Sequence, residues 1–459
     1  MVTNVSQTAA VESSAAQGRE RWGSRLAFVL AAAGSAVGLG NIWKFPYITG
    51  EYGGGAFVVT YLACIALIGV PILMAEVMIG RRGGNGPVGS LMRLAITERR
   101  SPLWAIAGWS GMLGSFIILS FYSVIAGWAV SYVVAAASGS FAGADADAIG
   151  AVFSGLLASP GTLIGWHTLF MAMTVAVVAR GVRAGLERAV TVLMPALFVL
   201  LLVLVGYAMT TDEFSHGVTF LFAADFSQLS TEAVLAALGH AFFTLSLGMG
   251  IMIAYGSHLR RDTSIAGTAV TIAVMDTVVA LLAGLAIFPV VFANGLTPGA
   301  GPGLIFQTLP LAFGNMPGGL VFGTLFFVLL TVAAWTSTIS LLEPTVEWLE
   351  EQHGIRRFTA AIGAGTAIWA LGLVSALSFN LWSEISLFGK GLFDLLDFLT
   401  ANIMLPLTGL LVALFAGWGL SRRASADELG DGTLHAAWHF VIRFVTPAAV
   451  LIVFVYNLL

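Results

Sequence analysis

The strongest constraint on this chain is a series of apolar runs of about 20 residues, which recurs from near residue 26 to the C-terminus. Each run is long enough to cross a hydrocarbon core of about 30 Å as a helix. Only 10% of the residues are charged, whereas ordinary soluble domains carry about 25%. Because such a chain cannot cover a soluble surface, we expect an all-α polytopic membrane protein. Residues 1–18 are polar and small, which predicts a disordered cytoplasmic tail.

The composition also argues against several classes of function. A net charge of −4 without a basic tract gives no electrostatic basis for binding nucleic acid. The single cysteine, Cys64, lies inside an apolar run and excludes an intrachain disulfide and a cysteine-based zinc site. The sequence has no HExxH, GxGD or P-loop pattern, so it supports neither an intramembrane enzyme nor ATP-driven pumping.

Basic residues sort the loops between eleven predicted membrane spans. Of the 20 Lys and Arg residues, 17 fall on one side of the spans, and the exceptions are Lys44, Lys390 and Arg443. Basic loops mark the cytoplasmic side, so the N-terminus is expected inside and the C-terminus outside a cell (inner) membrane. The predicted spans are about 24–47, 55–80, 103–137, 162–179, 187–211, 233–258, 264–293, 317–350, 357–378, 386–419 and 435–457.

Two of these spans, the first and the sixth, are interrupted by glycines. The first contains AAAGSAVGLGNIWKFPY, and the sixth contains HAFFTLSLGMGIMIAYGSH. Unwound backbone at the bilayer midplane can coordinate a cation and a polar ligand where it lines a cavity, as in secondary transporters. Alternatively, Gly34 and Gly38 form a close-packing motif between helices. Asn41, Thr244 and Ser246 at the same depth favour a binding site, because close packing does not require polar side chains.

These strings resemble a known family of membrane carriers. RERWGSRLAFVLAAAGSAVGLGNIWKFPY followed by GGGAF, FFTLSLGMG in span 6 and AAWTSTIS in span 8 look like the neurotransmitter:sodium symporter family. The resemblance extends from about Arg19 to Pro447, and eleven helices are typical of many bacterial members. It implies the LeuT-type fold, with two inverted five-helix repeats whose helices 1 and 6 are broken. The repeats would cover residues 19–211 and 233–420, followed by an eleventh helix at 435–459.

The resemblance also implies two sodium sites built entirely from oxygen ligands, which suit a hard alkali cation. The first would be completed by the substrate carboxylate. The second would lie between the broken helix 1 and helix 8, although isolated Ser and Thr hydroxyls often bond to carbonyls of their own helix instead. The residues expected at the first site are Ala36, Asn41, Thr244 and Asp276, and those at the second are Gly34, Val37, Ala333, Thr336 and Ser337.

By the same resemblance, the substrate lies against the unwound backbone of helix 1. There Tyr122 would cap its carboxylate, and a helix N-terminus with free amides stabilises such an anion. Gly38 stands where amine transporters of the family carry an aspartate, so we expect a substrate that brings its own carboxylate. The expected contacts are Ala36, Gly38, Leu39, Gly40, Ile118, Tyr122, Phe243, Thr244, Ser246, Met249, Ser337 and Leu341. This largely apolar set favours a neutral, hydrophobic amino acid.

Scarce charges in a membrane protein usually have partners, and the resemblance places two pairs at gates. Lys44 and Asp397 are expected above the site, and Arg19 with Trp22 is expected to meet Glu351 below it; Arg19 and Glu351 could instead be solvated loop residues. Next to the upper gate, His240 occupies a position typically held by Gln. It is either a neutral core histidine or a pH-responsive group of that gate.

Asp276 is the only ionisable residue in the run VTIAVMDTVVALLAGLAIF of span 7. A carboxylate at bilayer depth is costly unless it faces a cation or gives up its charge. Beside sodium it could stand in for the chloride that other family members bind, so we expect transport that is independent of chloride. The alternative is a carboxyl that is hydrogen-bonded to a neighbouring helix.

The sequence therefore predicts a sodium-coupled symporter of neutral, hydrophobic amino acids that works by alternating access. An alternative substrate is another small zwitterion, such as a β- or γ-amino acid. A channel is less well supported, because channels line a continuous path with repeated polar rings whereas polarity here concentrates near one depth. A substrate-sensing membrane receptor is a further alternative. The oligomeric state and the identity of the amino acid stay open.

Overall fold

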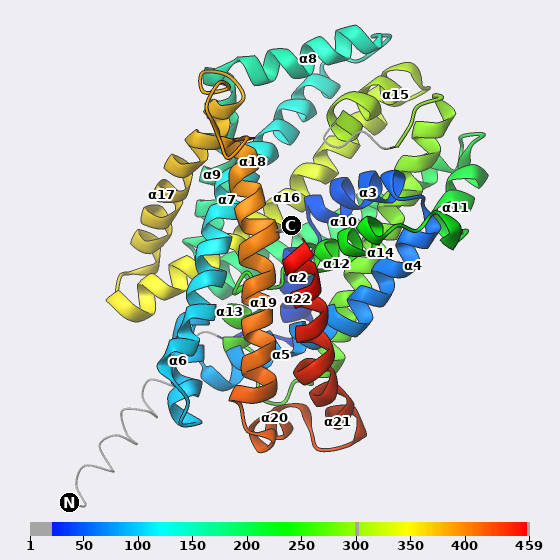
Figure 1. Ribbon diagram of the computed structural model, residues 1–459. Coiled ribbons are helices and arrows are strands. Elements are labelled where there is room, and N and C mark those ends of the chain that lie inside the picture. Colours follow the sequence, from blue (N-terminus) through cyan, green and yellow to red (C-terminus); the bar gives the residue numbers. More distant parts are fainter. Residues whose placement is uncertain (1–20, 299–302, 457–459) are drawn as a thin grey trace, which may run out of the picture.

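Long helices stand side by side in this chain, and shorter helices cover the two ends of the bundle (Figure 1). The computed structural model describes residues 21–298 and 303–456. Within these residues nine helices are long and apolar enough to cross a membrane, and the bent pair Arg25–Ala36 and Gly40–Glu51 makes a tenth. The sixth predicted span is divided into α12 (Thr231–Thr244) and α13 (Ile251–Ser257), each too short to cross alone. The polytopic helical fold is thus confirmed.

The first five spans are built from helices α2 to α10. α6 and α8 are the connecting helices at opposite ends of the bundle (Figure 1). The segments are α2 (Arg25–Ala36), η1 (Gly40–Lys44), α3 (Phe45–Glu51), α4 (Gly55–Cys64), η2 (Ile65–Gly69), α5 (Val70–Gly83), α6 (Pro87–Thr97), η3 (Pro102–Trp104), α7 (Ala105–Ala137), α8 (Ala146–Ala158), α9 (Pro160–Val178), η4 (Val182–Glu187) and α10 (Arg188–Ala208).

The remaining spans begin after a short connection. These segments are α11 (Phe214–Phe222), η5 (Phe226–Gln228), α12, α13, α14 (Ile265–Ala293), η6 (Leu304–Thr308), α15 (Leu309–Asn315), α16 (Gly319–His353), α17 (Arg357–Ser378), β1 (Ser386–Leu387), β2 (Lys390–Gly391), α18 (Leu392–Phe398), η7 (Leu399–Met404), α19 (Leu405–Leu414), η8 (Phe415–Gly419), α20 (Arg422–Leu429), α21 (Thr433–Phe440), η9 (Val441–Val445) and α22 (Thr446–Tyr456).

Span 10 starts later than the sequence predicts. Residues 386–391, which we expected to be helical, form a small antiparallel hairpin in which Leu387 pairs with Lys390. Phe388 and Gly389 at its tip have φ values of 54° and 75°, which a helix does not accommodate. The span therefore begins at Leu392.

Helix 1 and helix 6 break for different backbone reasons. In helix 1, Val37 turns extended (φ −76°, ψ 99°), and the chain re-enters a π-helical turn at Gly40 with a bend of 50°. In helix 6, Gly248 and Gly250 have φ values of 72° and 73°, a left-handed conformation that glycine adopts at little cost. Ser246 is held at φ 54°, which is strained for a residue with a side chain.

The helices pack in two groups that surround these breaks. α7, α9, α16 and α17 pack on one another, and α2, α5, α13 and α14 form the second group. Each group takes members from both halves of the chain at a spacing of five spans, as inverted repeats require. The bounds of the two repeats, 19–211 and 233–420, stay predictions.

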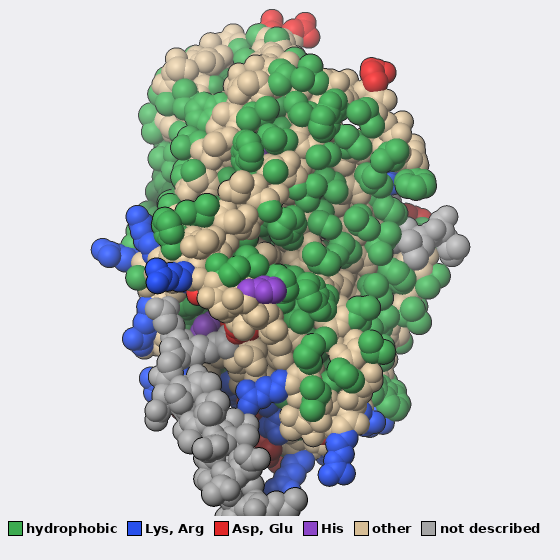
Figure 2. Space-filling view, turned by 90° about the vertical axis from the view of Figure 1, so that its left-hand side faces the viewer, with side chains coloured by type: hydrophobic (Ala, Val, Ile, Leu, Met, Phe, Trp, Pro, Cys, Tyr) green, Lys and Arg blue, Asp and Glu red, His purple; other side chains and the backbone are tan. Residues whose placement is uncertain are grey.

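The two ends of the bundle differ in charge. In Figure 2 most visible Lys and Arg side chains lie in the lower half, prominent Asp and Glu side chains lie at the top, and a broad apolar belt covers the middle. We call the end that carries α8 and the hairpin the outer end, and the end that carries α6, α20 and the basic loops the inner end. The predicted tail, 1–18, and Arg19 lie outside the described residues.

Candidate ion and substrate site

The breaks of helices 1 and 6 face each other and are joined by serines. Ser246 Oγ donates to the carbonyl oxygen of Ser35 at 3.0 Å, and Ser35 Oγ donates to Ser246 Oγ at 3.1 Å. From α16, Ser337 Oγ also reaches the Ser35 carbonyl at 3.3 Å. These contacts stabilise the strained backbone of Ser246. Glu76 of α5 supports the same break, since its Oε1 accepts the Gly248 amide at 2.8 Å.

Two of the residues predicted for the first sodium, Asn41 and Thr244, converge on the buried carboxyl of a third, Asp276. Asn41 Nδ2 donates to Asp276 Oδ1 at 2.7 Å, and Thr244 Oγ1 donates to the same oxygen at 2.8 Å. All three side chains are completely buried. Tyr61, which the sequence did not suggest, donates to Asp276 Oδ2 at 3.2 Å. The result is a carboxyl surrounded by neutral oxygen and amide groups, with no cationic side chain among its described hydrogen-bond partners.

The residues predicted for the second sodium lie between α2 and α16. Both hydroxyls donate to the carbonyl oxygen of Ala333 in their own helix, Thr336 Oγ1 at 2.9 Å and Ser337 Oγ at 3.3 Å. This is the alternative that the sequence left open. The helices approach closely here, because a Cβ added at Gly34 would lie 3.4 Å from Thr336 Cβ. Val37 is fully buried one turn further along.

A narrow cavity of about 20 Å³ lies between the two breaks and α7 and α16. Ten of the twelve predicted substrate residues line it, together with Ser35, which the sequence analysis missed. The lining is Ser35, Ala36, Gly38, Gly40, Ile118, Tyr122, Phe243, Ser246, Met249, Ser337 and Leu341. The predicted contacts Leu39 and Thr244 do not line the cavity. The lining combines the apolar side chains of Ile118, Phe243 and Met249 with the hydroxyls of Tyr122, Ser246 and Ser337.

Tyr122 ties α7 to the unwound part of helix 1. Its hydroxyl oxygen accepts the Leu39 amide at 2.9 Å. The backbone comes close at this point, since a Cβ added at Gly38 would lie 2.7 Å from Tyr122 Oη and closer still to Ser337 Oγ. A side chain at position 38 therefore requires the hydroxyl ends of Tyr122 and Ser337 to shift, which favours glycine here.

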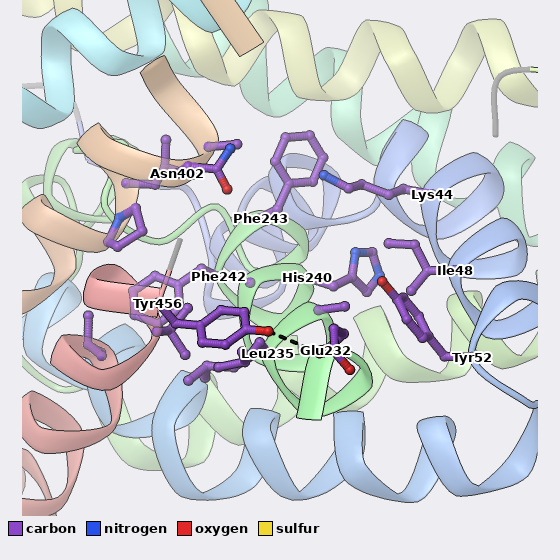
Figure 3. Close-up of a pocket in the computed structure, with 18 of the residues that line it drawn as sticks. Lys44, Ile48, Tyr52, Glu232, Leu235, His240, Phe242, Phe243, Asn402 and Tyr456 are labelled. Carbon is purple, nitrogen blue, oxygen red and sulfur yellow. Dashed lines mark hydrogen bonds between the residues drawn. The ribbon is translucent and has the colours of Figure 1, made fainter. Parts of the chain in front are cut away.

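Outside this cavity lies a larger vestibule of about 380 Å³. Figure 3 shows Lys44 pointing toward the Phe243 ring, with its Nζ 4.8 Å from the ring centroid. No described ion pair joins Lys44 to Asp397, so the predicted upper gate is not closed by that pair in this structure. Phe243 lines both the vestibule and the inner cavity and therefore separates them.

His240 also lines the vestibule, but its ring is almost fully buried. It packs against Tyr61 and Phe45, with ring centroids 5.2 Å and 6.0 Å away. Neither ring nitrogen has a hydrogen-bond partner among the described residues. This position favours the neutral core histidine over a charged group of the gate.

At the inner end, the predicted gate is described only in part, because Arg19 lies outside the described residues. Trp22 is buried, and its Nε1 donates to the carbonyl oxygen of Tyr255 at 3.1 Å. Glu351 accepts the Gly86 amide at 2.9 Å. Tyr255 Oη in turn donates to Ser340 Oγ of α16 at 2.8 Å, a link that the sequence analysis missed.

Broken helices that meet at a buried polar site, between two groups of packed membrane helices, define a secondary transporter. The model of the Sodium:neurotransmitter symporter family matches residues 19–147 and 153–459, and the chain belongs to this family. It is a sodium-dependent, multi-pass membrane transporter and not an enzyme.

Similar proteins agree with this assignment. The sodium-dependent transporter YhdH of Bacillus subtilis (strain 168) is 39% identical, over 95% of this chain and 96% of its own length. A sodium-dependent transporter of Haemophilus influenzae is 35% identical, over 96% of this chain and 98% of its own length. The crystal structure of MhsT in complex with L-phenylalanine has a TM-score of 0.88 and 45% identity, and the match covers 96% of this chain and 100% of that one.

Proposed function

We propose that this protein is a symporter that uses sodium to import neutral, hydrophobic α-amino acids by alternating access. The observation that carries the proposal is the narrow cavity between the two helix breaks, whose polar end adjoins the Asp276 cluster. The similar MhsT was crystallised with L-phenylalanine, which supports the substrate class. Because the basic loops gather at one end of the bundle, we expect the N-terminus inside and the C-terminus outside the cell membrane.

Each end of an amino acid has a suitable partner in this cavity. The carboxylate would lie against the backbone of Gly38 to Gly40 and accept the hydroxyl proton of Tyr122, whose oxygen already accepts the Leu39 amide. The side chain would lie among Ile118, Phe243 and Met249, which are apolar and line the cavity. Tyr122 and Ser337 both crowd the backbone at Gly38, which favours an α-amino acid over the longer β- and γ-amino acids.

Sodium would bind in two places and couple to the substrate at the first. At this first site, Asn41, Thr244, Asp276 and the Ala36 carbonyl would share the ion with the substrate carboxylate. The second ion would lie among the carbonyls of Gly34, Val37 and Ala333 and the hydroxyls of Thr336 and Ser337, which would turn away from their own helix. Because Asp276 supplies a fixed negative charge beside the first ion, we expect no chloride requirement.

Binding of radiolabelled L-phenylalanine to purified protein tests the proposal, with sodium exchanged for choline or potassium. Two ligands that touch are coupled reciprocally, typically by 1–3 kcal/mol, so affinity should fall about 5- to 150-fold without sodium. Equal affinity in sodium and choline would contradict it.

Counterflow in proteoliposomes separates a carrier from a channel or a receptor. Liposomes preloaded with unlabelled substrate should accelerate uptake of label if the protein exchanges bound substrate across the membrane. A channel would show no such acceleration, and a substrate-sensing receptor would show no uptake.

A further inference from the structure

Arg443 is one of the three basic residues that lie outside the basic loops, and neither proposed ion site uses it. It belongs to η9 in the last span and lies beside the end of helix 10, where a Cβ added at Gly417 would be 2.8 Å from Arg443 Cα. Helix 10 ends at Gly419, and the basic residues of α20 follow. Arg443 therefore lies at the depth of the inner membrane boundary.

Exposed aromatic rings surround the Arg443 guanidinium. Its Cζ is 3.8 Å from the Trp418 ring centroid and 5.5 Å from that of Phe444. Trp418 is fixed in place, because its Nε1 donates to the Arg443 carbonyl oxygen at 3.1 Å. Trp418, Phe444 and Phe440 are 47%, 49% and 59% exposed. We call Arg443 and these three rings the inner aromatic patch.

No carboxylate neutralises Arg443 among the residues that the structure describes. The described ion pairs do not include it, and its buried Nε has no hydrogen-bond partner. An uncompensated cation at the lipid-facing surface is costly unless its planar donor fork reaches an anion. The patch therefore lacks a counter-ion from within the described chain.

Further positive charge lies around the patch. Arg422 and Arg443 both lie close enough to His439 to interact with it electrostatically. Arg100 donates to the Trp418 carbonyl oxygen at 3.2 Å. Two carboxylates lie nearby. Glu98 accepts hydrogen bonds from the hydroxyl and amide of Ser421, and Asp431 interacts electrostatically with His435 of α21. The balance of charge at the patch is positive.

We propose that the inner aromatic patch binds the phosphate of an anionic phospholipid from the leaflet at the inner end. Arg443 would hold the phosphate through its planar fork, which matches phosphate geometry. The exposed rings would pack against the upper acyl chains, as interfacial aromatic residues do. Arg422 and Arg100 add charge that favours a headgroup with a net negative charge over a zwitterionic one.

Native mass spectrometry of the delipidated, full-length protein in micelles tests this site, with dioleoyl phosphatidylglycerol or dioleoyl phosphatidylcholine added as the probe. We expect the parent to retain phosphatidylglycerol in preference to phosphatidylcholine. Arg443→Gln should weaken phosphatidylglycerol binding about fivefold, which corresponds to the ~1 kcal/mol that one basic residue contributes at an anionic surface. Arg443→Lys should lose part of this affinity, because it keeps the charge without the fork.

Arg423→Gln is the matched control, since Arg423 is exposed on α20, next to Arg422, and makes no described ion pair. It should leave phosphatidylglycerol binding unchanged. Equal binding by the parent and Arg443→Gln would overturn the proposal, as would complete displacement of the lipid by inorganic phosphate at millimolar concentration. A parent dimer that Arg443→Gln converts to a monomer would also overturn it, because the patch would then be an interface between copies. Thermal unfolding of each variant confirms that it is folded.

Discussion

The outer and inner halves of the central pathway are closed by different kinds of contact. On the outer side a vestibule of about 380 Å³ reaches Phe243, which also lines the substrate cavity. Above that ring Lys44 makes a cation–π contact and no described ion pair. On the inner side polar and charged groups lie directly between the helices. Phe243 is thus the lining residue that the vestibule and the substrate cavity have in common.

Inner closure depends on several long-range contacts between helix 6 and α16. Tyr255 Oη donates to Ser340 Oγ at 2.8 Å, and His258 Nε2 lies 3.2 Å from Glu347 Oε1. Deeper in α16, the Glu343 carboxylate, which is 1% exposed, is paired with Arg357. The contacts between helix 6 and α16 join the two helix groups, whereas the Glu343–Arg357 pair lies within one group, between α16 and α17. We infer that the buried polar contacts of the inner half contribute more to the free energy of unfolding than the contacts of Phe243 and Lys44 do.

The largest expected effect comes from breaking the buried inner ion pair. Arg357→Ala leaves the Glu343 carboxylate buried without its partner, a change that typically costs about 3–5 kcal/mol. The melting temperature in detergent should therefore fall clearly. Arg356→Ala, at the exposed neighbouring position, should stay within about 0.5 kcal/mol of the parent. Equal melting temperatures for the two variants would contradict a large contribution of this buried pair to stability.

Asp276 lies at the boundary between the two halves and is the next test. Asp276→Asn removes the only fixed charge at the first sodium site, so the sodium concentration needed for half-maximal substrate binding should rise about tenfold or more. Uptake by the parent should be equal in gluconate and chloride. A parent that requires chloride would contradict this role, as would a variant with unaltered uptake and no response to chloride.

Tyr122→Phe tests the substrate end of the same boundary. The lost hydroxyl deprives the substrate carboxylate of a donor, and a hydrogen bond to a charged group contributes about 1.5–3 kcal/mol. The dissociation constant for L-phenylalanine in sodium should therefore rise about tenfold or more, with little change in melting temperature. Unchanged affinity would mean that Tyr122 only packs between α7 and helix 1.

The smallest effect is expected at the outer end. A cation–π contact at an exposed site contributes about 0.5–1 kcal/mol, so Lys44→Gln should change the substrate dissociation rate only a few-fold. A double-mutant cycle with Asp397→Asn decides whether the two residues pair during transport. Additive effects would agree with the separation seen here, whereas a coupling energy above about 0.5 kcal/mol would show that the predicted gate forms.

Much of the fold follows from the sequence, because the bilayer restricts each apolar run to a helix. The breaks were also predictable, since glycines and polar side chains that gather at one depth of the bilayer indicate unwound backbone. The hairpin at 386–391 was not predicted, although SLFGKG contains a lysine and two glycines, because we placed the start of the apolar run that follows it too early.

The candidate site was predicted less evenly. Most cavity residues come from the two broken helices. The sequence motifs of these helices were therefore enough to identify them. Tyr61 was missed because it is 215 residues from Asp276 in the chain and its own run reads as an ordinary apolar helix. The pairing of Glu343 with Arg357 was missed for a related reason, as only the packing of α16 against α17 brings the inner ends of these helices together.

The crowding at Gly38 has a consequence for how the substrate class of such a carrier could change over evolution. An amine without a carboxylate needs an aspartate from the protein at this position, yet a side chain here would collide with Tyr122 Oη and Ser337 Oγ. A single Gly38→Asp substitution should therefore abolish amino-acid transport without creating amine transport. Both the Tyr122 and the Ser337 hydroxyl would have to move to make room for the new side chain, so a change of substrate class at this position involves three residues at once.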